Sequence, residues 1–255
     1  MNAAVVPGLP EIRAGEDLAG LIAEQVELRP EDVVCVASTA VSKAEGRAAD
    51  LDAFPPGPRA TELADRLSAL TGEEKDPRFA QAVLEESTEL LIESPFLLTE
   101  ARPGHVTVNA GIDRSNVPDA DVLLLPERPM ASARRLADRL GTRVVITDTS
   151  GRPFRHGQRG VAIGWAGLPA ARDWRGEPDR EGRELSVTME AVVDELAGTA
   201  NLLGGEGAEG TPVVLIRDWT FGELAGDDEL FRAVETDFVR QALRQWSYED
   251  GGERA

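Results

Sequence analysis

The sequence predicts an α+β protein, and two observations lead to this fold class. Short apolar runs of strand character alternate with stretches of helical spacing, but the alternation is irregular and several strands follow one another directly. The 255 residues are enough for one large core or two smaller ones. We expect a single unit over residues 1–255, with a possible subdomain break near 54–60.

The first part of the chain is predicted to contain one buried strand followed by two helices. EDVVCVAS, at 31–38, is an apolar run between acidic and hydroxyl residues, and the next stretch, 39–51, continues as a loop or an early helix. FPPGPR, at 54–59, breaks the chain. Leucine and valine recur on one helical face over 60–72 and 78–90.

The middle of the chain reads mainly as strands. Three short runs of period-two character over 89–111 predict an antiparallel group, and DVLLLPE at 121–127 predicts a further strand. MASARRLADRLG, at 130–141, is an amphipathic helix that ends at Gly141. RVVITDTS, at 143–150, is the next strand.

Two helices and two strands are expected in the last part of the chain. QRGVAIGWAG, at 158–167, reads as a strand whose small residues suit close packing, and TPVVLIRDW, at 211–219, reads as another. Long helices are predicted at 185–205, where glycines follow, and at 227–246.

Composition and charge exclude several classes of function. The net charge of −19 opposes binding to nucleic acid, and the dispersed acidic surface suggests a halophilic, salt-adapted cytosol. No apolar run approaches ~20 residues and no signal peptide begins the chain, so we expect no membrane association. Cys35 is the only cysteine and lies in an apolar run, where an inert buried thiol is expected. A cytoplasmic location follows.

Familiar catalytic motifs are absent from the sequence. It contains no G-x-x-x-x-G-K-[ST] motif, no dinucleotide fingerprint and no G-x-S-x-G. His105 and His156 are the only histidines, so no Cys/His set could bind zinc. The sequence therefore gives no support for a serine or cysteine nucleophile.

Several apolar runs open into small residues, hydroxyls and one charged side chain. Asp113, Asp148 and Glu206 are candidate ligands of Mg²⁺ or Mn²⁺, with the Thr149 hydroxyl as a further oxygen donor and Lys43 as a phosphate contact. Each has a simpler reading. Asp148 could cap a turn, Asp113 could form an Asx-turn, and Glu206 could lie in a surface loop after a helix C-cap.

Three arginines follow the acidic strand end and would suit an anionic substrate. They are Arg152, Arg155 and Arg159, and solvation of the surface is the alternative explanation for them.

Taken together, five stretches resemble the coenzyme F420-0:L-glutamate ligases, the γ-glutamyl ligases of deazaflavin coenzyme biosynthesis. The stretches lie in order between residues 6 and 218: GLPEI, ASTAVSKAEGR, NAGIDRSNV, VITDTSGRPFRHGQRGVAIGWAG and GGEGAEGTPVV. The resemblance implies that L-glutamate is added to the lactyl carboxylate of the coenzyme precursor with GTP, followed by a further γ-linked glutamate. It also implies two divalent metal ions, Mg²⁺ or Mn²⁺, and a monovalent cation such as K⁺.

The resemblance further implies a role for individual residues. Asp113 and Asp148 match ligands of one metal, and Thr149 and Glu206 match ligands of the second, although Glu209 could align in place of Glu206. Lys43 and Asp148 are the catalytic candidates. The positions that match nucleotide contacts are Leu9, Pro10, Glu11, Ile12, Ser38, Thr39, Lys43, Asn116, Gly204, Gly205, Glu206, Gly207, Ala208, Glu209, Gly210 and Thr211.

The family fold implied by the resemblance is an unusual α+β arrangement with a mixed or antiparallel sheet, seen as an intertwined homodimer. Some relatives carry a nitroreductase-like domain after the ligase, and we expect none here. Two other functions stay open at this point. One is a non-catalytic protein that binds nucleotide or metal, and the other is an amide ligase for another carboxylate.

Overall fold

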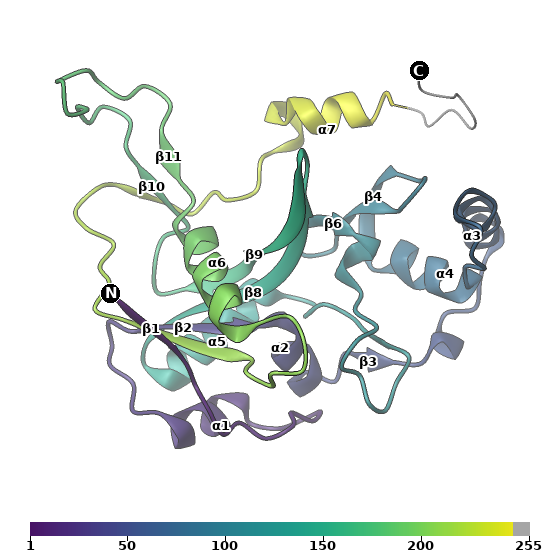
Figure 1. The fold of residues 1–255 in the computed structure, drawn as a ribbon, viewed down its shortest axis with the longest axis horizontal. Coiled ribbons are helices and arrows are strands. Elements are labelled where there is room, and N and C mark those ends of the chain that lie inside the picture. The colour runs from purple at the N-terminus through teal and green to yellow at the C-terminus, as the bar shows by residue number, and fades with distance from the viewer. Residues whose placement is uncertain (247–255) are drawn as a thin grey trace. The chain divides into compact units, whose positions relative to one another are not determined.

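In the computed structural model, a five-stranded mixed sheet contains the strand that ends in Asp148 and Thr149 (Figure 1). The strand order is β1-β12-β2-β8-β9, and only the β2–β8 pair is parallel. The structure describes residues 1–246. The strands of this sheet are β1 (Asn2–Val5), β2 (Val33–Ala37), β8 (Arg143–Arg152), β9 (Arg155–Ala166) and β12 (Val213–Arg217).

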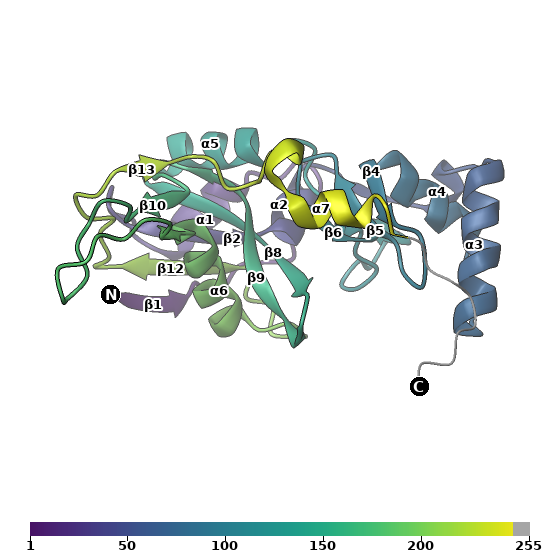
Figure 2. The ribbon, with the colours of Figure 1, turned by 90° about the horizontal axis from the view of Figure 1, so that it is seen from above.

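Two helices cover opposite faces of this sheet (Figure 2). Helix α6 (Val192–Gly204) packs its buried side chains against one set of alternating strand residues, which includes Val33, Cys35 and Val145. Helix α5 (Pro129–Leu140) lies on the other face. Because both faces are covered, the central strands are almost continuously apolar, and burial raises the pKa of the Cys35 thiol to about 12.

The chain divides into two compact units. The first comprises residues 1–46 and 126–230 and contains the five-stranded sheet; the second comprises 47–125 and the described residues from 231 on. Besides the sheet, α5 and α6, the first unit contains α1 (Leu18–Gln25), α2 (Ser38–Ala44), β10 (Ala171–Asp173), β11 (Met189–Glu190) and β13 (Gly226–Asp227).

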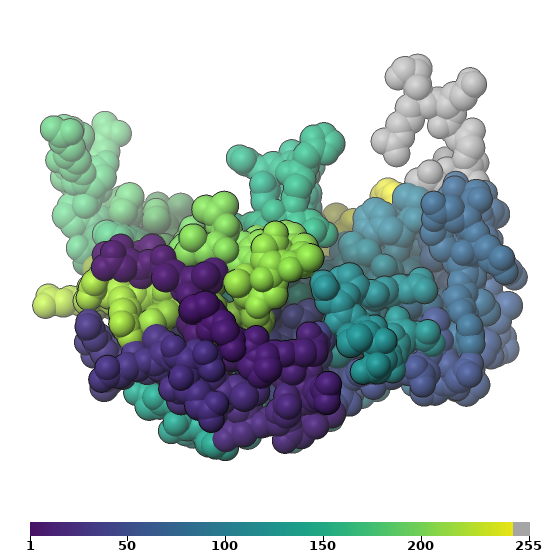
Figure 3. Space-filling view, turned by 60° about the horizontal axis from the view of Figure 1, so that its bottom comes forward, coloured from purple at the N-terminus to yellow at the C-terminus, as the bar shows by residue number. Residues whose placement is uncertain are grey.

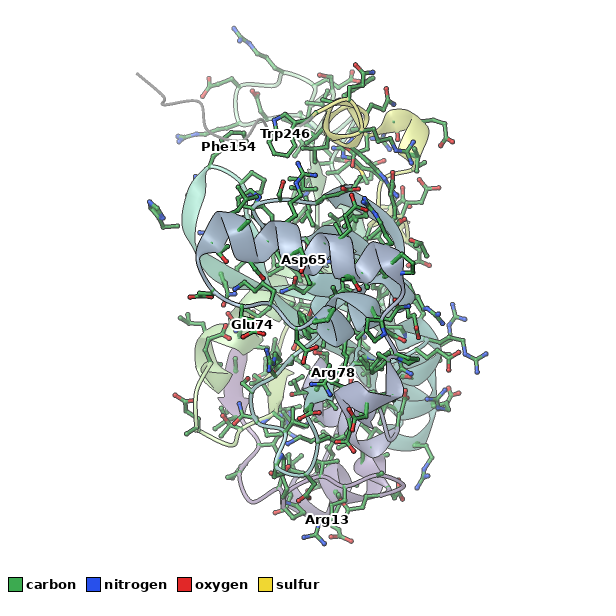
Figure 4. The ribbon with its side chains drawn as sticks, turned by 90° about the vertical axis from the view of Figure 1, so that its right-hand side faces the viewer. Arg13, Asp65, Glu74, Arg78, Phe154 and Trp246 are labelled. Carbon is green, nitrogen blue, oxygen red and sulfur yellow. The ribbon has the colours of Figure 1, made fainter. Side chains whose placement is uncertain are left out.

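The second unit is built around the antiparallel sheet β4-β5-β6. Helix α3 buries Leu63 and Leu67 and exposes Asp65, which Figure 4 labels on this helix. The elements of this unit are β3 (Ala48–Ala49), η1 (Leu51–Ala53), α3 (Pro58–Thr71), α4 (Pro77–Glu85), β4 (Ser87–Ile92), β5 (Leu98–Ala101), β6 (Val106–Val108), η2 (Asn109–Gly111), β7 (Val122–Leu123), η3 (Val234–Thr236) and α7 (Phe238–Leu243).

The predicted α+β class with a mixed sheet is confirmed, and most predicted elements lie within a few residues of their expected positions. The antiparallel group at 89–111 is the sheet β4-β5-β6. Strand β1 and helix α1 were missed. None of the helices that the structure describes is long and apolar enough to cross a membrane.

Two predicted helices are wrong in extent. The helix expected at 185–205 begins only at Val192, because the segment before it bonds elsewhere: Leu185 donates its N–H to the carbonyl of Glu177, and β11 pairs with β10. The helix expected at 227–246 is reduced to α7. The Asp227 carboxylate accepts the backbone N–H of Glu229, which favours a turn in place of a helix.

Candidate active site

The exit of β8 presents oxygen donors on both sides of one strand. Strand β2 ends at Ala37, opposite Thr147, so beyond this point β8 is paired only with β9. Successive side chains of a strand point to opposite faces. The side chains of Asp148 and Thr149, which are adjacent in the strand, therefore point to opposite faces and contact different neighbours.

Asp148 lies against the first residue of α2. The Ser38 hydroxyl donates to its Oδ1 over 3.1 Å, and Ser38 is only 3% exposed. The resemblance implied a nucleotide contact for Ser38. Its hydroxyl here serves to orient the carboxylate of Asp148, a role that the sequence alone did not indicate.

Thr149 faces the loop that follows α6. Its hydroxyl donates to Oε1 of Glu206 over 3.3 Å, and the side-chain amide of Asn201 donates to the same oxygen over 2.5 Å. A carboxylate has no hydrogen to give, so the Asn201 amide must present its NH₂ group. Sequence reasoning missed Asn201. The only signal for it was its place one turn before the glycine loop.

The loop over residues 204–211 is closed by its own hydrogen bonds. Gly205 and Gly210 have positive φ, and the Thr211 hydroxyl donates to the Gly204 carbonyl over 2.7 Å. Glu209 turns back and accepts the Gly207 N–H over 2.8 Å. The geometry thus favours Glu206 over Glu209 as the partner of Thr149.

Lys43 and Glu11 come together from two of the stretches that were assigned to nucleotide. The Lys43 ammonium forms an ion pair with the Glu11 carboxylate, and 16% of the Lys43 side chain is exposed. Around them Ile12 is buried, while Leu9 and Thr39 are half-buried. A nearly buried ammonium with an exposed acidic partner can exchange that partner for a phosphate oxygen.

Asp113 belongs to the second unit and is held by a local turn. Its Oδ1 accepts the N–H of Ser115 over 2.7 Å and the Ser115 hydroxyl over 2.8 Å, and its backbone pairs with Leu123. The Arg114 guanidinium lies 5.4 Å from the ring centre of Phe79 on α4. Asn116 follows with positive φ. The Asx-turn reading of Asp113 is therefore correct, and the carboxylate still has its second oxygen for other partners.

The three arginines predicted to receive an anion do not form one group. Arg152 and Arg155 are paired at the exposed end of the β8–β9 hairpin, which stands clear of the surrounding surface in Figure 3. Phe154, labelled in Figure 4, is fully exposed between them. Arg159 instead donates to the carbonyl of Asp194 on α6 over 3.2 Å, so it supports the hairpin.

Asp194 anchors β9 to the start of α6. Its Oδ1 accepts the backbone N–H of Ala162 over 2.9 Å, and burial raises the pKa of its carboxyl group. At Gly160 the strand touches the helix directly: a Cβ there would lie 2.3 Å from the carbonyl oxygen of Ala197. Gly160 is the register partner of Thr149, so this contact fixes the position of Thr149 relative to α6.

The donors at the strand exit suit a hard divalent cation. They are carboxylate and hydroxyl oxygens, which Mg²⁺ and Mn²⁺ prefer, and these ions usually keep waters and substrate phosphates as their remaining ligands. No group of three His, Cys, Asp or Glu residues in the described part of the chain could hold a metal by itself. The residues present fit an ion that is completed by substrate.

Comparison with known proteins gives a consistent result. The model of the family described as F420-0:Gamma-glutamyl ligase matches residues 8–218. The chain is 68% identical to a coenzyme F420:L-glutamate ligase of Natronomonas pharaonis, with 98% of each chain covered. It is 66% identical to one of Halorubrum lacusprofundi, covering 98% of this chain and all of the relative. Identity to one of Archaeoglobus fulgidus is 47%, over 94% and 96% of the two chains.

Proposed function

Because this chain belongs to the F420-0:gamma-glutamyl ligase family, we propose that it ligates L-glutamate to the coenzyme F420 precursor, F420-0, using GTP. The observation that carries this proposal is the strand exit, where the Thr149 hydroxyl and the Glu206 carboxylate lie 3.3 Å apart and Asp148 precedes them. The names and coverage of the relatives support the ligase reaction.

Amide formation at neutral pH requires an activated carboxyl group. In the proposed reaction, a carboxylate oxygen of the precursor attacks the γ-phosphorus of GTP, the bond to the β-phosphate oxygen breaks, and GDP leaves. The glutamate amine then attacks the acyl phosphate, loses a proton, and phosphate departs. In the second addition, the γ-carboxylate of the first glutamyl residue is phosphorylated by another GTP, and the amine of the second glutamate displaces the phosphate. Positioning and charge neutralisation suffice for these steps, which agrees with the absence of a nucleophile motif.

Four residues are assigned to two divalent metal ions. Asp113 and Asp148 would hold one ion, and Thr149 and Glu206 the other. When bound, such ions neutralise phosphate charge and polarise the transferred phosphoryl group. Ser38 orients Asp148 within the first unit through its hydroxyl. A monovalent cation, K⁺, completes the proposed set.

Lys43 is assigned to the phosphates of GTP. It would leave its ion pair with Glu11 for a phosphate oxygen, while the backbone of the 204–211 loop and Asn116 contact the nucleotide. The remaining nucleotide contacts are Leu9, Pro10, Glu11, Ile12, Ser38 and Thr39. A homodimer and a cytoplasmic location belong to the same proposal, and light scattering of the purified protein tests the dimer.

The decisive experiment is an assay with purified protein, GTP, Mn²⁺, L-glutamate and the precursor at high KCl, read by product mass. We expect gains of one and two glutamyl units with release of GDP. The Asp148→Ala variant should lose at least ~10³-fold in rate, since it removes a metal ligand at the reacting phosphate. Asp138→Ala, at an exposed position of α5, is the matched control.

The other outcomes identify the alternatives. GDP release without a glutamyl product would indicate another acceptor acid. No turnover in any salt or metal, with nucleotide still bound, would indicate a binding protein and overturn the proposal.

The exposed arginine Arg155 is assigned to an anionic substrate. Arg155→Ala should raise KM for the precursor or for glutamate about tenfold without changing thermal stability, because its side chain lies at the exposed hairpin end. Unchanged KM values for both substrates would remove Arg155 from the site.

A further inference from the structure

The last turn of α6 carries Asn201, a polar side chain that none of the ligand assignments includes. We propose that Asn201 is a positioning residue that fixes the Glu206 carboxylate as a ligand of the second metal ion. This inference rests on the proposed function, because it takes Thr149 and Glu206 as the ligands of that ion.

The first argument is the hydrogen bonding of Glu206. Its Oε1 accepts from Asn201 Nδ2 over 2.5 Å and from Thr149 Oγ1 over 3.3 Å. A cation held by Thr149 and Glu206 would displace the weaker contact, since the hydroxyl would then turn its oxygen to the metal. The Asn201 amide, which is not an assigned ligand, can keep its bond to the carboxylate. Donors of this kind orient a ligand without touching the metal.

The second argument is the chain geometry around Glu206. Gly205 ends α6 with φ 76° and donates its N–H to the Asn201 carbonyl, so Asn201 holds both the backbone turn and the carboxylate that follows it. Without the amide, Glu206 would be an exposed side chain in a glycine-rich loop, free to take several rotamers. Ordering it would then oppose metal binding.

The third argument connects Asn201 to the strand. A Cβ on Gly160 would lie 2.7 Å from Cβ of Asn201, and Gly160 is the register partner of Thr149. The same contact of strand and helix therefore sets the positions of Thr149 and Asn201 together. Glu206 contacts both residues from the loop after α6. The positions of Thr149, Asn201 and Glu206 therefore depend on the contact between β9 and α6 at Gly160, within the first unit.

The test is Mn²⁺ binding to the full-length protein in the presence of GTP, with free Mn²⁺ measured by electron paramagnetic resonance. The wild type should bind two ions. Asn201→Leu keeps the branched shape of the side chain but removes the hydrogen-bond donor. It should lower the affinity for one of the two ions by about 10–100-fold, as loss of a hydrogen bond to a metal ligand typically does. Asn201→Gln, which keeps an amide donor, should recover part of this affinity.

Matched variants separate positioning from a structural role. Thr199→Ala removes a hydroxyl of the same helix that donates to the Glu195 carbonyl, and the binding of both ions should be unchanged. If the role of Asn201 were purely structural, its substitution would lower the melting temperature but leave the Mn²⁺ affinity unchanged at a temperature where the protein is folded. If Asn201→Leu does not fold, Asn201→Ser, which is too short to reach Glu206, replaces it in the same titration.

The outcomes also distinguish this inference from the proposed function. Two ions bound with unchanged affinity in Asn201→Leu or Asn201→Ser would overturn the positioning role and leave the ligase proposal standing. A wild type that binds no Mn²⁺ with GTP would instead overturn the metal assignments themselves, and with them this inference.

Discussion

The exit of β8 in the first unit and the Asp113 turn in the second unit both carry proposed metal ligands, but they are built in different ways. Asp148 and Thr149 are held by a strand that pairs with β9 from Val144 to Arg152 and packs on α6. Asp113 is held by a turn of three residues and one bridge to Leu123. One region is fixed by the sheet, and the other by side chain–backbone bonds.

The difference shows how each region sets the direction of its ligands. In the strand, alternation sends Asp148 to Ser38 and Thr149 to Glu206, so the direction follows from position in the sequence. In the turn, the direction of Asp113 depends on the Ser115 hydroxyl and on Asn116 at positive φ. We therefore expect the strand exit to resist perturbation better than the turn, and three experiments test this comparison.

The largest effect is expected from pH, acting on the second unit. His105 is 7% exposed beside the ring of Phe231, its Nε2 has no hydrogen-bond partner in the described structure, and burial lowers its pKa to about 4. In the unfolded chain the pKa is about 6.5. As pH falls, the unfolded state therefore takes up the proton before the folded state does. The contribution of His105 to the free energy of unfolding is fully present above pH 6.5 and is lost as pH falls toward 4, a loss that approaches about 3 kcal/mol.

Urea unfolding at pH 7 and pH 4.5 measures this loss. Because carboxylates titrate over the same range, the informative quantity is the difference between the wild type and His105→Gln, whose stability should change less with pH. His156→Gln, at the exposed hairpin end, is the control and should behave as the wild type. If the free energies of unfolding of the wild type and His105→Gln changed equally between pH 7 and pH 4.5, protonation of the buried imidazole would not be what destabilises the protein at low pH.

A smaller effect is expected when the junction of β9 and α6 is opened. In Gly160→Ala the new methyl group would meet the Ala197 carbonyl at 2.3 Å, and backbone atoms cannot move aside cheaply. We expect a loss of about 1–3 kcal/mol in unfolding free energy and a weaker Mn²⁺ site at Thr149. Gly151→Ala, in the same hairpin with nothing within 4 Å of the new atom, should leave both quantities unchanged. If the two variants behaved alike, the junction would not be what makes the strand exit rigid.

The sequence predicted the parts of both regions that depend on local pattern. The apolar run before Asp148 and the Asx-turn reading of Asp113 come from periodicity and turn chemistry, and both are present in the structure. The sequence could not predict Asn201 as the partner of Glu206, or Ser38 as the partner of Asp148. The Ser38–Asp148 contact joins residues 110 positions apart and depends on strand register. The Asn201–Glu206 contact spans only five positions but depends on how the glycine loop turns back after α6, which single-residue patterns do not encode.

The same limit explains the two shortened helices. Residues 185–191 and 228–237 have adequate helical composition, but pairing with β10 uses backbone groups of the first segment, and the Asp227 carboxylate accepts a backbone N–H of the second. The Asp237 carboxylate caps α7 through the N–H of Arg240 and so sets where that helix begins. Local alternatives and tertiary pairing therefore outweigh propensity in these segments.

The smallest effect is expected at the support of the Asp113 turn. The Arg114 guanidinium lies 5.4 Å from the ring centre of Phe79, a cation–π contact worth about 0.5–1 kcal/mol at an exposed site. In Phe79→Leu this contact is lost while an apolar side chain remains. Because this contact supports the turn in addition to the hydrogen bonds of Ser115, KM for GTP should rise and the apparent affinity for Mn²⁺ should fall, each by about two- to fivefold, with kcat nearly unchanged.

Phe96→Leu is the matched control, because Phe96 is a partly exposed phenylalanine of the same unit. The measurement is the set of kcat and KM values at several Mn²⁺ concentrations. Identical values in Phe79→Leu and the wild type would show that the hydrogen bonds of Ser115 alone hold Asp113. The turn would then be as well determined as the strand exit, and the contrast between the two regions would lie in how they are built and not in how firmly they hold their ligands.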